Sequence, residues 1–544
     1  MMRRIFEAEG GRWLRLMGAN VLAVVLVSGC GPGHREIGAA MEDALVAPAF
    51  AADATWADDV REFYANRELR PAWTNGRGLN GRGRRVAALL DSTERNGLDP
   101  SPYGTWEIAR LREAIDNTED QAVRVAMIAT LDAQISAGYR RYLGDLDAGA
   151  VGASDFMDRP HRETTSLVAK LDAAAAGDDP SSIAKSLEPV SPQYSDLKSA
   201  LVRYTDIARL GGWPTVSIHA DSGATATQLR ARLIAEGDPV ESDKASRGAA
   251  TPASFDTTLV AALRHFQKRH GLEEHGRLDN ATLRELNTPV QQRIATLSLN
   301  LDRWRAMPRE TSPLGIRVNI PAYELAVLEN DQPVLEMKVV VGALAHPTPV
   351  MIDTMEYVVT SPYWNVPASI LSEEIAPGVA DDDDYLHDRS MEIVSRDDTS
   401  VVIEPGSIDW DELNVDSIDW LVRQRPGAHN ALGRVKFMFP NSLDIYLHDT
   451  PSKSGFEQTI RALSHGCVRL EKPIELARLI LARRASVDQD IDALVATGDE
   501  KHIPLDHGIP VHIVYLTASA DNGIVRFHAD IYGLDQRVGE MVDA

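Results

Sequence analysis

The pattern of apolar residues changes partway along the chain, and this change limits the folds that the sequence can adopt. Between about residues 60 and 210, apolar residues recur every three or four positions, which is the spacing of amphipathic helices. From Ile316 onward they form short runs broken by Pro and Gly, such as 316–320 and 335–341, which are typical of β-strands. We therefore expect a multi-domain α+β protein with a helical N-terminal part and a mixed, β-rich C-terminal domain.

The length and the cysteine content further limit the folds that are possible. A chain of 544 residues should contain about three domains. It has two cysteines, Cys30 and Cys467, so the fold must depend on buried apolar cores rather than on a disulfide framework. The 56 basic and 80 acidic residues give a formal charge of −24. This charge argues against nucleic acid as a partner, because phosphate binding needs a basic face.

Residues 1–30 have the pattern of an export signal. Basic residues precede an apolar run at 21–27, which is followed by small residues and Cys30, as in a bacterial lipoprotein signal peptide. The run is too short to span a bilayer, which needs about 20 residues. We expect lipidation at Cys30, a tether at 31–55, and a periplasmic protein that is lipid-anchored to the cell envelope. A plain signal peptide, which would give an exported soluble protein, and an uncleaved anchor are the alternatives.

Two helical regions are predicted before the β-rich domain. The first is a scaffold domain at 56–215, and the second is a small three-helix module at 225–288. Within the module, residues 256–270 form an amphipathic pattern, and Asp279 can cap a second short helix. A further helix at 289–310 should connect the module to the β-rich domain.

The module resembles a known cell-wall module. The resemblance lies in the stretch from Phe266 to Leu272 and in Gly276, Thr282 and Leu286, which are similar to the small peptidoglycan-binding module of cell-wall enzymes. It implies contact with peptidoglycan, and a purely structural role is an equally open interpretation.

Cys467 lies close in sequence to two histidines. Residues 444–449 alternate like a strand that ends near His448, and His465 and Cys467 follow 17 and 19 residues after it. A thiol is only a few per cent thiolate at pH 7, so a nucleophilic cysteine needs a base within hydrogen-bond reach. Gly466 allows a sharp turn that can present backbone N–H groups to a substrate carbonyl. The helical pattern that follows would add the positive end of a helix dipole.

These residues allow three interpretations on their chemistry alone. They could form a catalytic Cys–His pair, or they could be a packed histidine and an inert core thiol. They could also bind zinc, but one cysteine with histidines at this spacing is not a familiar tetrahedral ligand set. We expect no metal and no cofactor.

The residues around both histidines resemble the active-site signature of the L,D-transpeptidase catalytic domain, also called the YkuD-like domain. The signature lies in 445–451 and 464–470. Segments that resemble the larger, YcbB-like branch are Val341-Gly342 with Thr348-Pro349, 362–367, and 430–433 with Lys436-Phe437. The resemblance implies a catalytic domain at 314–540 with a capping segment inserted at 370–427, which we expect to move as a lid.

The resemblance also implies a role for each site residue. Cys467 would be the nucleophile, and His448 its base and later proton donor, oriented by the backbone carbonyl of Asp449. The backbone N–H groups of His465, Gly466 and Cys467 would hold the oxyanion. Substrate contacts are expected from Arg469, for which a structural ion pair is the alternative, and from Tyr446, Trp364, Asn430 and Gly433.

The implied reaction is acyl transfer on peptidoglycan stem peptides. The thiolate would attack the amide between the third residue, diaminopimelate, and the terminal D-Ala, and a second stem's side-chain amine would take the acyl group. Carbapenem-type inhibitors are expected to acylate Cys467. The same site could serve an L,D-carboxypeptidase or attach lipoproteins to peptidoglycan, and the non-enzyme alternative is a peptidoglycan-binding scaffold.

Overall fold

The computed structural model describes most of the chain, namely residues 33–46, 55–150, 166–218, 222–240, 255–309, 312–410, 413–415, 417–483 and 490–543. The predicted signal peptide with Cys30 lies outside the described residues. Most of the predicted tether is described, and its residues His34–Leu45 form a helix with Ile37 and Met41 buried. Among the described helices, none has both the length and the apolarity needed to cross a membrane.

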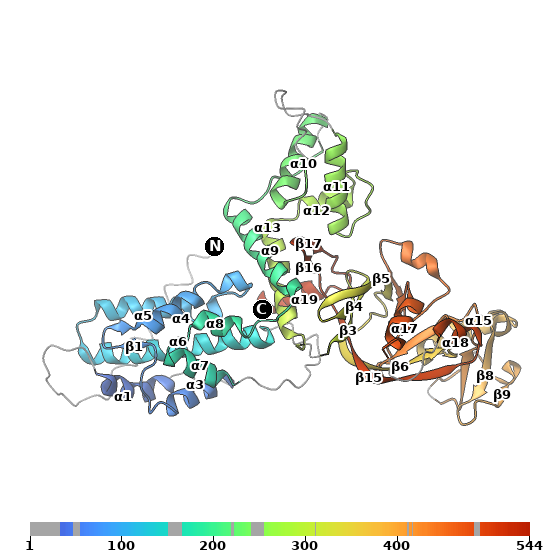
Figure 1. The fold of residues 1–544 in the computed structure, drawn as a ribbon, viewed down its shortest axis with the longest axis horizontal. Coiled ribbons are helices and arrows are strands. Elements are labelled where there is room, and N and C mark those ends of the chain that lie inside the picture. Colours follow the sequence, from blue (N-terminus) through green and yellow to red (C-terminus); the bar gives the residue numbers. More distant parts are fainter. Residues whose placement is uncertain are drawn as a thin grey trace. The chain divides into compact units, whose positions relative to one another are not determined.

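The chain divides into two compact units, each described here by itself. The first comprises Met1–Ala88, Gly104–Arg140 and Val168–Asp178, and the second comprises Leu89–Tyr103, Arg141–Leu167 and Asp179–Ala544. The first unit is helical (Figure 1) and contains a short hairpin. Its elements are α1 (His34–Leu45), α3 (Thr55–Ala65), β1 (Thr74–Asn75), β2 (Gly78–Leu79), most of α4 (Gly81–Leu90), α5 (Thr105–Asn117), α6 (Gln121–Ala148) up to Arg140, and α7 (Leu167–Ala176) from Val168.

A buried carboxylate organises the first unit. Asp132 on α6 is fully buried and accepts hydrogen bonds from the Tyr64 hydroxyl at 2.5 Å and the Thr74 hydroxyl at 2.7 Å. The backbone N–H groups of Ala72 and Trp73 donate to it at 2.9 and 2.8 Å. Burial raises the pKa of Asp132, and the four donors oppose this effect. They compensate the carboxylate for the water that it loses.

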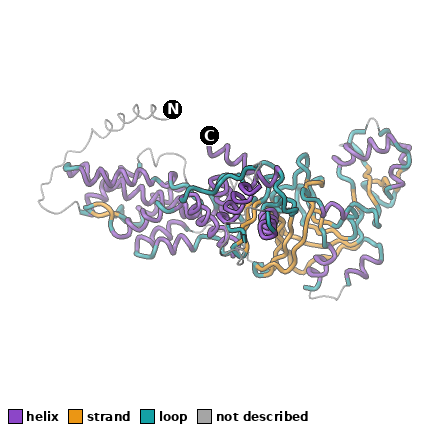
Figure 2. The backbone as a smooth tube through the Cα atoms, turned by 90° about the horizontal axis from the view of Figure 1, so that it is seen from above, coloured by secondary structure: helices purple, strands orange, loops and turns teal. Residues whose placement is uncertain are grey.

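The second unit contains a nine-stranded mixed sheet (Figure 2) in the order β13-β5-β14-β12-β11-β6-β15-β3-β4. β5 also pairs with β4, so the hydrogen-bonded order closes on itself through β5. Pairs β12–β14, β13–β5 and β15–β3 are parallel. The strands are β3 (Leu314–Asn319), β4 (Glu324–Glu329), β5 (Gln332–Gly342), β6 (Met351–Thr360), β11 (Val435–Met438), β12 (Leu447–His448), β13 (Ala462–Ser464), β14 (Val468–Leu470) and β15 (Lys501–Val514).

Strand alternation decides which face of this sheet carries the site. Leu447, Val468 and Leu470 are fully buried in a core that also includes side chains of α17 (Pro473–Leu481) and α18 (Ile491–Ala496). Because successive residues of a strand point to opposite faces, His448 and Arg469 point away from this core. The β-rich domain therefore buries one face of these short strands and leaves the other for chemistry.

The small helical module consists of α10 (Ser222–Glu236), α11 (Thr257–Arg269) and α12 (Asn280–Leu286). The Asp256 side chain caps α11 by accepting from Leu259 N at 2.9 Å. Asp279 caps α12 by accepting from Thr282 N at 2.7 Å, which agrees with the cap predicted from the sequence. The prediction of a helical N-terminal part, a helical module and a mixed β-rich domain is confirmed.

Buried charges fasten the module to α9 (Pro192–Arg209). Glu236 at the end of α10 accepts from the Tyr204 hydroxyl of α9 at 2.7 Å and pairs with Arg232 at 2.6 Å and Arg269 at 2.9 Å. Burial alone would raise the pKa of Glu236, but Arg269, His270 and Arg232 outweigh burial and hold it well below its usual value. These charged side chains are engaged in docking the module, so they are not available to a ligand.

The second unit contains further elements besides the module and the sheet. α13 (Val290–Ala306) packs with α9 and with the ends of the C-terminal strands. The remaining elements are η2 (Thr93–Asn96), η3 (Ser101–Tyr103), α8 (Pro180–Lys185), η8 (Lys453–Glu457), β16 (Ala518–Asp521), β17 (Ile524–Phe527) and α19 (Leu534–Asp543).

The segment expected as a capping insertion, called the capping subdomain below, has its own sheet and core. β7 (Trp364–Asn365), β10 (Trp420–Gln424), β8 (Met391–Ser395) and β9 (Val402–Ile403) form a four-stranded sheet. Trp364 and Val366 pack in its core, so this subdomain begins near 364, earlier than the expected 370. Its other elements are α14 (Ala368–Ile370), the π-helical turn η6 (Leu371–Ile375), α15 (Ala376–Asp381), α16 (Tyr385–Asp388) and η7 (Pro405–Ser407).

Candidate active site

Two adjacent parallel strands assemble the candidate active site. β12 and β14 pair with Leu447 opposite Val468 and His448 opposite Arg469. Cys467 directly precedes β14, two positions before Arg469, and packs half-buried against the core of this domain. Residues separated by about twenty positions in the sequence thus meet at one place on the sheet.

His448 has the environment of a neutral base. Its side chain is buried, and its Nδ1 lies 2.5 Å from the backbone carbonyl oxygen of Asp449. A carbonyl can only accept, so Nδ1 carries the proton and the lone pair is on Nε2. Burial lowers the pKa of His448 to about 3, and the nearby charge of Arg469 acts in the same direction. The imidazole is therefore uncharged at neutral pH.

Cys467 is half-buried and protonated at neutral pH. Burial raises the pKa of its thiol to about 11, and hydrogen bonds from Tyr446 partly oppose this rise. The thiol donates to the backbone carbonyl oxygen of Asp444, 3.6 Å from Sγ. Cys467 is therefore a thiol and His448 a neutral imidazole at rest, so any attack by this sulfur must move the thiol proton.

Two cations lie close enough to the thiol to interact with its charge. Burial lowers the pKa of Arg469, and negative charge at Cys467 opposes this shift. The same holds for Lys436 of β11, which pairs with His448 in the sheet and lies 5.6 Å from the Tyr446 ring centre. Both would stabilise negative charge that develops during attack. The sequence analysis assigns no role to Lys436. The signal that could have indicated one is the pairing of its strand with the strand that ends at His448.

A chain of hydrogen bonds holds the loop at 464–467 that carries Cys467, here called the nucleophile loop. Gly466 has a φ of +111°, which favours glycine, and its carbonyl accepts from the Thr348 hydroxyl at 2.6 Å. The Thr348 hydroxyl accepts from Gly342 N at 2.8 Å, and the Tyr532 hydroxyl donates to the Gly342 carbonyl at 2.6 Å. Thr348 and Tyr532 are structural supports that the sequence-based site lacks.

The backbone N–H groups of this loop are not equivalent. Gly466 N–H already donates to the Ser464 hydroxyl at 3.2 Å. The N–H groups of His465 and Cys467 have no acceptor within the described part of the chain. These two remain free to meet an oxyanion, whereas Gly466 provides the turn.

Asp449 anchors the segment that orients His448. Its carboxylate accepts from Lys453 Nζ at 2.6 Å and from the backbone N–H groups of Thr450 at 2.7 Å and Arg434 at 2.9 Å. Burial would raise the pKa of Asp449, but Lys453 and these amides hold it below its usual value. Gly433 lies against this carboxylate: its φ is +59°, and an added Cβ would be 2.5 Å from Asp449 Cγ. Close packing against Asp449 explains why this position is a glycine, and the substrate contact expected for it stays a prediction.

Asn430 and Trp364, also expected to contact substrate, have structural partners within the domain. Asn430 is buried, its amide donates to the carbonyls of Pro362, Gln424 and Arg425, and its oxygen accepts from Leu432 N. These hydrogen bonds show that the Asn430 side chain stabilises a turn. Trp364 pairs with Gln424 in the four-stranded sheet and packs in the core of that subdomain.

His465 is exposed, and its side chain faces the capping subdomain. Its Nε2 lies 2.9 Å from a carboxylate oxygen of Glu374, and its ring centre is 4.8 Å from that of His346. His346, Glu373 and His465 place one ligand atom each within 4.8 Å of one another, so these residues could hold a metal ion.

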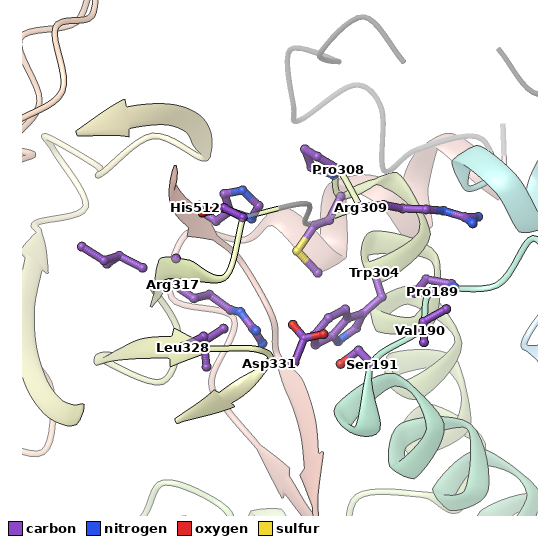
Figure 3. Close-up of a pocket in the computed structure, with 14 residues that line it drawn as sticks. Pro189, Val190, Ser191, Trp304, Pro308, Arg309, Arg317, Leu328, Asp331 and His512 are labelled. Atoms are coloured by element: carbon purple, nitrogen blue, oxygen red, sulfur yellow. The ribbon is translucent and has the colours of Figure 1, made fainter. Parts of the chain in front are cut away.

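A separate cavity of about 210 Å³ lies elsewhere in the second unit (Figure 3). It is lined by residues at the end of α13 and in β3, β4 and β15, including Trp304, Arg317, Asp331 and His512. The Arg317 guanidinium lies 4.9 Å from the Trp304 ring centre. Neither Cys467 nor His448 is among the residues that line it, so this cavity is distinct from the site at Cys467.

Three family models match successive parts of the chain. Residues 313–513 match the L,D-transpeptidase catalytic domain (YkuD), residues 58–201 a scaffold domain, and residues 222–286 the "Putative peptidoglycan binding domain". The prediction of a YkuD-like catalytic domain, which is an enzyme domain, together with a peptidoglycan-binding-like module is confirmed.

The chain is also similar to a particular protein. The "Putative L,D-transpeptidase" of Haemophilus influenzae is 36% identical over 242 residues, which are 44% of this chain. The match spans about half of that relative, 48% of its length.

Solved L,D-transpeptidase structures are more distant. The enzyme from Mycobacterium smegmatis is 11% identical, covers 37% of this chain and 58% of its own, and has a TM-score of 0.19. The protein from Stackebrandtia nassauensis is 13% identical, with 57% and 98% covered and a TM-score of 0.21. LdtMt1 in complex with imipenem is also 13% identical, with 37% and 59% covered and a TM-score of 0.18. TM-scores this low do not establish a shared fold.

Proposed function

We propose that this chain is a cell-wall L,D-transpeptidase that cross-links the third residues of peptidoglycan stem peptides through a thioester on Cys467. The observation that carries the proposal is the register of β12 and β14, which sets His448 opposite Arg469, two residues beyond Cys467. The match of residues 313–513 to the L,D-transpeptidase catalytic domain supports this assignment.

The first half-reaction forms the thioester. His448 Nε2 takes the thiol proton as Sγ attacks the carbonyl carbon between diaminopimelate and D-Ala. The oxyanion meets the free N–H groups of His465 and Cys467. The imidazolium then gives its proton to the D-Ala nitrogen, the C–N bond breaks, and D-Ala leaves. Asp449 contributes by fixing the tautomer that has its lone pair on Nε2.

The second half-reaction returns the thiol. The side-chain amine of a second stem attacks the thioester carbon and loses a proton to His448. The C–S bond breaks, the sulfur takes the proton back, and a new amide joins the two third residues. Every proton is carried by His448, so the cycle consumes no other reactant.

The binding and localisation predictions belong to the same proposal. The match of residues 222–286 supports contact of the module with peptidoglycan. Carbapenem-type inhibitors would acylate Cys467 by the same attack. The sequence pattern before Cys30 supports export to the periplasm and a lipid anchor on that residue; Cys30→Ser should then release the protein from membrane fractions.

The test is incubation of the purified chain with disaccharide-tetrapeptides, followed by mass spectrometry. We expect cross-linked dimers, free D-Ala and a transient adduct on the Cys467 peptide, and none of these with Cys467→Ala. Trimmed tripeptides without dimers would assign hydrolysis instead, and turnover by Cys467→Ala would contradict the thioester mechanism.

A further inference from the structure

Three side chains beside the nucleophile loop converge in a way that the proposed reaction does not use. His346 lies between β5 and β6, Glu373 lies on η6, and His465 lies one residue before Gly466. One ligand atom from each lies within 4.8 Å of the others. His346 Nε2 and Glu373 Oε2 are 3.4 Å apart.

The two histidines are held on connected backbone. β13 pairs with β5, with Ser464 opposite Gly342, and Ala343 N donates to the Ser464 carbonyl at 2.7 Å. His346 N donates to the Ala343 carbonyl at 2.9 Å. These bonds fix the two histidine backbones relative to each other, so the pair of rings is preorganised to share a ligand.

The carboxylate comes from an unusual helical turn. η6 is a π-helical turn between α14 and α15, and single π-turns occur frequently at functional sites. Its consecutive residues Glu373 and Glu374 each approach one histidine, with Glu374 2.9 Å from His465. Glu374 can therefore bond to a ligated His465 or replace Glu373 as a ligand.

The geometry points to a binding site for a divalent transition metal, with zinc as the expected ion, formed by His346, His465 and Glu373. Two imidazoles and one carboxylate are a ligand set that zinc uses, with a fourth position open to water. Zinc–ligand bonds of 2.0–2.2 Å in a tetrahedron put neighbouring ligand atoms about 3.4 Å apart. The His346–Glu373 separation of 3.4 Å already has this value.

A bound ion would connect two parts of the catalytic domain. Glu373 belongs to the capping subdomain, whereas His465 belongs to the nucleophile loop. Zinc would fasten η6 to this loop beside Cys467, where the contacts of the two histidines with Glu373 and Glu374 now form a weaker link. Metal binding would thus restrain η6 without a change in the catalytic residues Cys467 and His448.

Zinc titration of the full-length chain after EDTA treatment tests the site, with isothermal calorimetry as the readout. We expect one zinc ion per chain, in the Cys467→Ala variant as well as in the native sequence. Loss of one ligand in His346→Ala or Glu373→Gln should weaken binding by more than the about 10-fold that loss of an outer-shell partner costs. The Glu373 side chain is 52% exposed, so Glu373→Gln is not expected to disturb folding.

The matched control is His387→Ala, which removes a histidine of the same subdomain whose side chain is 88% exposed. Its zinc affinity should equal that of the native sequence. The proposal is overturned if no zinc binds at micromolar concentration. It is also overturned if Glu373→Gln and His346→Ala bind zinc normally, or if Cys467→Ala abolishes binding, because the thiol would then be the ligand.

Discussion

Replacement of His448 with glutamine distinguishes two ways in which the Cys467 thiol could be activated. In one, the histidine is protonated before substrate arrives and stabilises a resting thiolate. In the other, it is neutral and removes the proton only during attack. The burial of His448 and the charge of Arg469 lower its pKa to about 3, which favours the second.

The magnitudes follow from the two pKa values. A thiol with a pKa of about 11 is ionised in about one molecule in 10,000 at pH 7, and this fraction rises tenfold per pH unit. A neutral histidine contributes no charge to that equilibrium, so His448→Gln should leave the thiolate fraction unchanged. Transpeptidation should fall by about 10²- to 10⁴-fold, the usual contribution of a general base.

The assay is alkylation of Cys467 by iodoacetamide between pH 7 and 10, followed by mass spectrometry of the Cys467 peptide. We expect the rate to rise through the whole range without a plateau, and to be the same in His448→Gln. A resting ion pair would shift the thiol pKa by about 1–3 units when the histidine is removed. A plateau below pH 8 in the native protein, or a tenfold slower reaction in the variant, would refute our reasoning.

Three further substitutions test the supports of the site and of the helical unit. Gly433→Ala should destabilise the catalytic domain by at least about 2 kcal/mol, because it adds left-handed strain to a clash with Asp449; an unchanged melting temperature in calorimetry would contradict this. Thr348→Val leaves the buried Gly466 carbonyl without its donor, so we expect about 1–3 kcal/mol of destabilisation and slower carbapenem acylation; normal acylation would argue against a supporting role. Asp132→Asn places an amide NH₂ group among four hydrogen-bond donors, so it should lower the stability of the first, helical unit by about 3 kcal/mol. Alkylation of Cys467 should stay unchanged. Equal circular-dichroism melting curves for the variant and the native protein would contradict this prediction.

The proposed catalytic residues are predictable from the sequence because their arrangement is local. An alternating strand that ends at His448 and a glycine turn before Cys467 need only one strand pairing to bring them together. The cap formed by Asp279 and the change from helical to strand periodicity are local for the same reason. Such features depend on neighbours within a few positions of the sequence.

The supporting contacts are not predictable in this way. Asn430 and Gly433 lie in a segment that resembles part of a substrate site, yet their roles depend on Pro362, 68 residues away from Asn430, and on Asp449. The cluster of His346, Glu373 and His465 joins three segments that no spacing rule connects. Resemblance indicated which segments matter, and only tertiary contacts distinguish packing from ligand binding.

The hydrogen bond from Tyr532 to Gly342 has a consequence for the limits of the catalytic domain. The family match ends at residue 513, but this tyrosine, which steadies the segment under the nucleophile loop, lies beyond that limit. The nucleophile loop therefore depends on a polypeptide stretch that also runs through β16 and β17 against α9 and α13. A protein shortened at residue 513 would retain every catalytic side chain and lose part of the support that positions them.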